Sequence, residues 1–166
     1  MRIESERIGA IYKTIKRALR SPILAAQPWV AYGVVLLCSG VFLGLAAEGN
    51  YESVEVLSRF GYLPAPAIWA GGYWALVTST FVHFELWHVA FNIYWIWMLG
   101  TRLERAIGTL PFLAFFLASA SISSSFQLAV SGTTGIGASG VVYAIFGFMW
   151  VTRNRYPEFS EDDATL

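Results

Sequence analysis

Three long stretches of this chain carry no charged side chain, and they limit what the chain can fold into. Arg, Lys, Asp and Glu are all absent from residues 27–47, 60–84 and 106–152. A helix needs roughly 20 apolar residues to cross the hydrocarbon of a bilayer, so stretches of this length favour lipid over a soluble core. Charged residues make up 13% of the chain, against about a quarter in a typical soluble domain. The sequence therefore predicts an all-α integral membrane protein.

We expect a bundle of four transmembrane helices, at residues 29–47, 86–101, 110–130 and 138–152. Pro28 precedes the first span and Gly49 follows it, and both residue types commonly bound helices. A cleaved signal peptide is the alternative for this segment, but its apolar run exceeds the usual core of ~7–15 residues. The last span is short, which favours a central, shielded position, although a bundle of only four spans would leave its flank bare.

The segment between the first and second spans, residues 48–85, is long and irregular. Its middle is uncharged but is broken by prolines and glycines at positions 64, 66, 71 and 72. Such backbone cannot cross lipid while facing it, because its polar groups would lack partners. The segment is also rich in Trp and Tyr, which prefer the membrane–water interface. We therefore expect a long structured loop that lies in the interface.

The basic residues indicate how the chain is oriented. Six lie in the leader, residues 1–28, and others are Arg102, Arg105 and two arginines of the tail, residues 153–166, whereas the long loop holds Arg59 alone. Because basic segments stay in the cytoplasm, both termini are expected there, with the long loop outside. Apolar residues recur at helical spacing in the leader, which indicates an interfacial helix on the anionic leaflet, with a solvated tail as the alternative.

Several function classes find no support in the sequence. The net charge is zero, so nothing favours a nucleic-acid partner. A single cysteine, Cys38, allows neither a disulfide within the chain nor a thiolate metal cluster. The two histidines, His83 and His88, are five residues apart in HFELWH, whereas the zinc-protease pattern H-E-x-x-H places them four apart with Glu directly after the first. We predict no metal and no cofactor.

Three polar residues stand out in the predicted spans, because polar groups are costly in hydrocarbon. His88 and Asn92 are four residues apart and share one helix face. Ser139 begins the last span, two crossings later, so all three lie on the same side of the membrane. Taken singly, Ser139 could be a helix N-cap, and the other two could join helices by hydrogen bonds.

Glycines surround Ser139 in GIGASG, residues 135–140. Gly135 and Gly137 allow a tight turn into the helix, and Gly140 permits close approach of a neighbouring helix. The first N–H groups of that helix have no partner within it, so they would stabilise a negative charge beside Ser139.

These motifs resemble those of the rhomboid family of intramembrane serine proteases. FVHFELWHVAFN matches the family pattern H-x4-H-x3-N at His83, His88 and Asn92, and GASG, residues 137–140, matches G-x-S-G. GTRLERAIG, residues 100–108, resembles the turn G-x-x-L-E-x-x-x-G. The loop YWALVTSTFVH also resembles the family, although Ala75 follows Trp74 where an arginine is common.

The resemblance implies a serine endopeptidase that cleaves transmembrane protein substrates near the outer leaflet. Ser139 would be the nucleophile, and His88, Asn92 and the backbone N–H of Ser139 would form the oxyanion hole. Supporting roles would fall to four further residues: Gly137 and Gly140 in the nucleophile motif, Tyr143 packed against the imidazole of the base, and His83 bracing the outer loop. The implied location is a bacterial inner membrane, with transmembrane proteins and lipids as partners.

The chain departs from the family pattern in a second, more serious respect. The resemblance places the general-base histidine on a sixth helix, whereas four spans are expected here. We therefore expect residues 29–152 to form a partial rhomboid domain without its fifth and sixth helices, and the chain as given not to cleave peptides. The alternative is a non-catalytic rhomboid-like protein that binds transmembrane clients.

Overall fold

The computed structural model of the chain describes residues 27–48 and 53–154, and these contain helices and no strand. The prediction of an all-α fold is confirmed for this part of the chain. The predicted leader and tail fall almost entirely on residues 1–26 and 155–166, outside the described residues.

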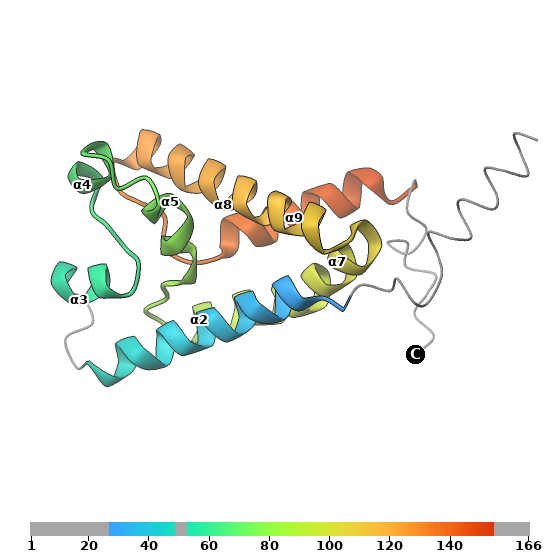
Figure 1. Cartoon of the computed structure of the whole chain (residues 1–166), viewed down its shortest axis with the longest axis horizontal. Coiled ribbons are helices and arrows are strands. Elements are labelled where there is room, and N and C mark those ends of the chain that lie inside the picture. The colour runs from blue at the N-terminus through green and yellow to red at the C-terminus, as the bar shows by residue number, and fades with distance from the viewer. Residues whose placement is uncertain (1–26, 49–52, 155–166) are drawn as a thin grey trace, which may run out of the picture.

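Two helices among the described residues are long and apolar enough to cross a membrane. They are α2, Trp29–Ala47, and α8, Thr109–Ser131. Both run along the long axis of the molecule, as does the shorter α9, Ser139–Thr152 (Figure 1). The start of α9 is recessed along this axis relative to the end of α8, so the residues between them lead the chain back into the molecule (Figure 1).

The second expected span is helical, but it is longer than the sequence analysis predicted. Helix α6, Leu86–Trp95, continues through the π-helical segment η3, Ile96–Gly100, into α7, Thr101–Ile107. The helix therefore extends beyond residue 101, where the predicted membrane span ends. Charged side chains do not end a helix, whereas Gly108, with φ of +94°, does because it turns the backbone out of the right-handed region.

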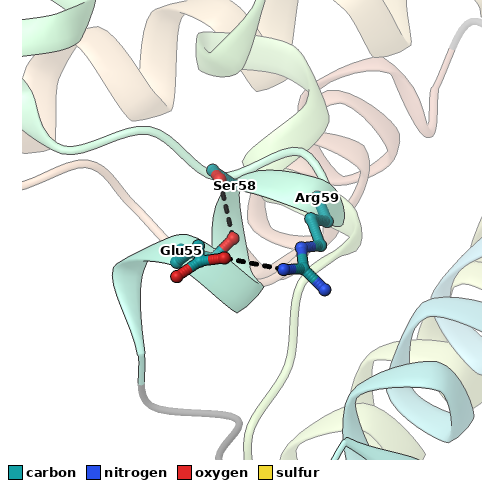
Figure 2. A network of polar contacts seen from close by, with 3 residues as sticks. All are labelled: Glu55, Ser58 and Arg59. Atoms are coloured by element: carbon teal, nitrogen blue, oxygen red, sulfur yellow. Dashed lines mark hydrogen bonds and ion pairs between the residues drawn. The ribbon is translucent and has the colours of Figure 1, made fainter.

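The long segment before α6 folds into short helices. These are α3, Val54–Arg59, α4, Ala65–Trp69, α5, Ala75–Thr78, and the 3₁₀ helix η2, Ser79–Phe81. In α3, Arg59 donates to the Glu55 carboxylate at 2.7 Å, and the Ser58 hydroxyl donates to the Glu55 carbonyl at 2.8 Å (Figure 2). Helices α3 and α4 lie at one end of the molecule and α7 lies at the other (Figure 1).

The core includes Ala31, Val34 and Cys38 of α2 and lies where α2 packs on α6, η3 and α8, with α9 packed on the same three elements. One buried charge, Glu104, joins α7 to the start of α2. Its carboxylate accepts the backbone N–H groups of Val30 at 3.1 Å and Ala31 at 2.8 Å. These N–H groups have no acceptor within their own helix, and a negative charge at a helix N-terminus is favourable. Glu104 therefore caps α2 from a distant part of the chain.

One face of α9 is not covered by other described residues. Val141, Val142, Ile145 and Met149 are buried, whereas Tyr143, Phe146, Trp150 and Val151 are exposed. The expectation that a short last span is shielded by its neighbours is therefore wrong for the described chain, and the bare flank expected of a four-span bundle is present.

Candidate active site

The turn that leads into α9 is built on Gly137. This residue has φ of +94°, a conformation that side chains with a Cβ rarely adopt. Its N–H donates to the carbonyl of Ser79 at 3.2 Å, which fastens the turn to η2. The GASG motif is therefore held by the segment that directly precedes the two histidines.

Both histidine rings lie against this turn. A Cβ placed on Gly137 would be 2.7 Å from Cε1 of His88 and 3.3 Å from Nε2 of His83. The centroids of the two imidazole rings are 5.0 Å apart, and the rings are arranged edge to face. No side chain fits at position 137 unless the His88 ring moves, so glycine is required there by both conformation and space.

His83 is fully buried and both of its ring nitrogens have partners. Nδ1 lies 3.1 Å from the Phe81 carbonyl, and Nε2 lies 3.4 Å from the Ala138 N–H. A neutral ring with its proton on Nδ1 fits both contacts, because it donates to the carbonyl and accepts at Nε2. Burial lowers the pKa of His83 to about 4, helped slightly by nearby His88 and opposed by the bond to Phe81.

Asn92 is fully buried one helical turn after His88. Its amide nitrogen donates to the His88 carbonyl at 2.9 Å. Since a carboxamide carries two N–H groups, one donor remains for another acceptor. The amide oxygen has no hydrogen-bond partner among the described residues.

Ser139 is the first residue of α9, and Ala138 occupies the N-cap position without a side-chain cap bond. The alternative reading of Ser139 as an N-cap is therefore wrong. The side chain is partly exposed, and none of its hydrogen bonds joins it to another described residue. Ser139 thus lies at a helix N-terminus, whose first N–H groups have no acceptor within the helix.

The remaining predicted residues line α9. A Cβ on Gly140 would be 2.5 Å from Cβ of Ser123, so this glycine lets α8 and α9 approach closely. Tyr143, one turn after Ser139, lies on the exposed face of α9. The structure brings together Gly137 and both histidine rings, two residues before Ser139. Asn92 is linked to this group by its hydrogen bond to the His88 carbonyl.

The sequence analysis missed the backbone groups that hold the site, namely the carbonyls of Ser79 and Phe81 and the N–H of Ala138. Every residue carries such groups, so no side-chain pattern could reveal them. It also quoted Glu104 only as part of a turn motif. No group of three or more potential metal ligands occurs among the residues that the structure describes.

Fold and site together define a helical membrane protein in which two histidine rings lie against the glycine turn two residues before a serine at a helix N-terminus. Comparison with known families identifies it further. A family model described as Rhomboid domain matches residues 70–161, and the chain belongs to the rhomboid family.

Curated relatives support this assignment. The chain is 34% identical over 125 residues to "Rhomboid protease GlpG" of Yersinia pestis (strain Pestoides F), which covers 75% of this chain and 44% of the relative. It is 41% identical over 85 residues to the protein of the same name from Yersinia enterocolitica, covering 51% of this chain and 31% of the relative. The chain therefore spans less than half the length of these curated relatives.

Proposed function

We propose that this chain supplies the nucleophile and the oxyanion hole of an intramembrane serine endopeptidase that cleaves transmembrane proteins near the outer leaflet. One observation supports the proposal. The His88 ring lies against Gly137, two residues before Ser139, as a shared oxyanion site at the start of α9 would require.

In the proposed reaction the Ser139 oxygen attacks the carbonyl carbon of a peptide bond. The hydroxyl proton passes to a general base, and the carbonyl oxygen becomes an anion. The backbone N–H of Ser139, the second amide N–H of Asn92 and the His88 ring would stabilise that anion. Removing one such donor typically costs about 2.7–4 kcal/mol of transition-state stabilisation.

Neither histidine of the chain suits the role of the base. His83 is held between Phe81 and Ala138 with both nitrogens occupied, and its lowered pKa makes it a weak proton acceptor. His88 belongs to the oxyanion side in this proposal. Since a serine hydroxyl is a poor nucleophile without a base, we expect the 166 residues alone not to cleave peptides.

A chimera tests the proposal. The chain would replace the matched segment of the Yersinia pestis relative, and cleavage of a transmembrane reporter would be measured in membranes. We expect cleavage by the chimera, none by its Ser139→Ala variant, and unchanged cleavage by Ser125→Ala, which alters an exposed serine of α8. Cleavage that survives Ser139→Ala would refute the role of this serine.

The second candidate is a non-catalytic rhomboid-like protein that binds transmembrane clients. This second function is favoured for the chain taken alone because neither of its two histidines suits the role of the general base. Crosslinking of clients to the chain, equal for the native sequence and Ser139→Ala, together with an inactive but folded chimera, would support this second function.

We also propose that the protein resides in a bacterial inner membrane with both termini in the cytoplasm. The exposed arginines of α7 support this orientation, because basic segments stay inside. A periplasm-sensitive reporter fused at the N-terminus should stay inactive, and one inserted after residue 61 should be active.

A further inference from the structure

Charges are separated along the long axis of the molecule. Arg102 and Arg105 of α7 and Arg153 after α9 are exposed, and α7 and the end of α9 lie at the same end (Figure 1). At the opposite end, beside α3, the exposed charges include Glu48 and Glu55. The exposed charges at the α7 end are therefore positive.

The acid that stands between the two α7 arginines is withdrawn from the surface. In the sequence RLER, Arg102 and Arg105 lie on one helix face because they are three residues apart, whereas Glu104, two residues after the first and one before the second, points elsewhere. In the structure Glu104 is fully buried and both of its oxygens accept N–H groups of α2. The arginines thus keep their charge at the surface without this acid as a partner.

Arg153 is held at a defined depth. The central carbon of its guanidinium lies 4.2 Å from the centroid of the Trp150 ring, which is a cation–π contact. Tryptophan rings prefer the headgroup level of a bilayer, so a guanidinium bound to one is expected at the same level. Within residues 27–48 and 53–154, the ion pair that the structure records is Arg59 with Glu55, at the other end.

Apolar surface adjoins these arginines. Leu110 lies just after α7, Val151 lies next to Trp150, and both are exposed. A ligand that covers both kinds of surface must carry an anionic head and an apolar chain. Arginine is also suited to phosphate, because its planar fork donates two parallel hydrogen bonds.

We propose that Arg102, Arg105 and Arg153 bind the phosphate groups of anionic phospholipids in the leaflet at the α7 end. The protein should therefore prefer phosphatidylglycerol to phosphatidylcholine. One arginine contributes about 1 kcal/mol of binding free energy at an anionic bilayer surface, which corresponds to about a fivefold preference for the anionic lipid.

Native mass spectrometry of the purified chain in detergent tests this proposal. The two lipids, with the same acyl chains, would be supplied at equal concentration and the bound copies counted. We expect the Arg102→Gln/Arg105→Gln variant to lose about 25-fold in its preference, and Arg102→Lys/Arg105→Lys to keep part of it because the charges remain. Arg59→Gln, at the other end, should leave the preference unchanged, and circular dichroism should show native helix content in each variant.

Four results would overturn the proposal. The first is equal binding of the two lipids by the native chain, and the second is an unchanged preference in the Gln double variant. The third concerns the acidic residues at positions 158, 161, 162 and 163. If replacing them by Gln and Asn creates a preference that the native chain lacks, the arginines bind that segment and not lipid. Displacement of phosphatidylglycerol by an equal concentration of inorganic phosphate would show that the acyl chains contribute nothing, and would also count against it.

Discussion

Replacing Gly137 by alanine should damage both the stability and the proposed activity of this protein. The residue has φ of +94°, and a non-glycine residue in that region is strained by about 1–3 kcal/mol. The new Cβ would also be 2.7 Å from Cε1 and 2.9 Å from Nε2 of His88, far inside normal contact. Relief requires the ring to shift, and overpacking of this kind costs about 1–3 kcal/mol. We expect a total loss of about 2–6 kcal/mol in the free energy of unfolding.

Two other glycines separate these contributions. Gly132 has φ of +69° and no atom within 4 Å of an added Cβ, so Gly132→Ala measures backbone strain alone. Gly140 lies within α9 without a positive φ, and its added Cβ would be 2.5 Å from Cβ of Ser123, so Gly140→Ala measures overpacking, offset by the better helix propensity of alanine. Thermal unfolding in detergent, followed by circular dichroism, should rank Gly137→Ala as the most destabilised of the three, with about 2–4 °C lost for each kcal/mol.

The same substitution should act on catalysis through His88. In the chimera described above, displacement of the ring from the proposed oxyanion hole should remove about 2.7–4 kcal/mol of transition-state stabilisation, which is a rate loss of about 100-fold or more. Gly132→Ala should cleave at the native rate below its unfolding temperature. If Gly137→Ala is no less stable than Gly132→Ala and cleaves as fast, the contact between the turn and His88 is refuted.

Three further predictions concern stability and are measured by the same unfolding assay. Glu104→Gln should cost about 1–3 kcal/mol, because one of the two buried N–H groups of α2 loses its acceptor, whereas Glu55→Gln, which breaks an exposed ion pair, should cost less than about 1 kcal/mol; equal effects would contradict the capping role. Native His83 has its pKa lowered to about 4 from 6.5, so the unfolded chain binds the proton more readily, and up to about 3 kcal/mol of stability present at pH 7 should be lost as the pH falls from 6.5 to 4. A His83→Gln variant should lack that part of the pH dependence, and an identical pH profile in the variant would rule out His83 as its source. Gly44→Ala should destabilise by about 1–3 kcal/mol, because its Cβ would be 2.5 Å from the Phe60 ring, while Gly40→Ala, with open space around it, should be neutral or stabilising; a neutral Gly44→Ala would mean that the Phe60 ring moves freely.

The sequence predicted the helices where the chain offers clear boundaries. Helix α2 occupies the expected residues because an apolar run lies between Pro28 and Gly49. Hydropathy predicts the part of the second stretch that can lie in lipid, which stops where the charges begin, whereas the helix itself continues to Gly108. The exposed face of α9 could not be predicted from periodicity, since apolar residues occur all around that helix.

The candidate site was predictable in its outline only. Counting membrane crossings placed His88, Asn92 and Ser139 on one side, and the glycine pattern indicated the turn at Gly137 that the structure shows. The contacts of His83 with Phe81 and Ala138 use backbone groups, which every sequence has everywhere. The catalytic role of Ser139 stays a prediction until the chimera is tested.

The cap that Glu104 forms on α2 has a consequence for biosynthesis. Its two hydrogen bonds join residues that are 73 and 74 positions apart in the chain, so the ribosome makes the first helix long before the side chain that completes it. Until α7 emerges, the leading N–H groups of α2 have only water or lipid headgroups as acceptors, which favours holding that end at the bilayer surface. Once Glu104 has been synthesised, its carboxylate can bind the start of α2 and join α2 to α7. A nascent chain stopped before Glu104 should therefore remain susceptible to membrane quality-control proteases.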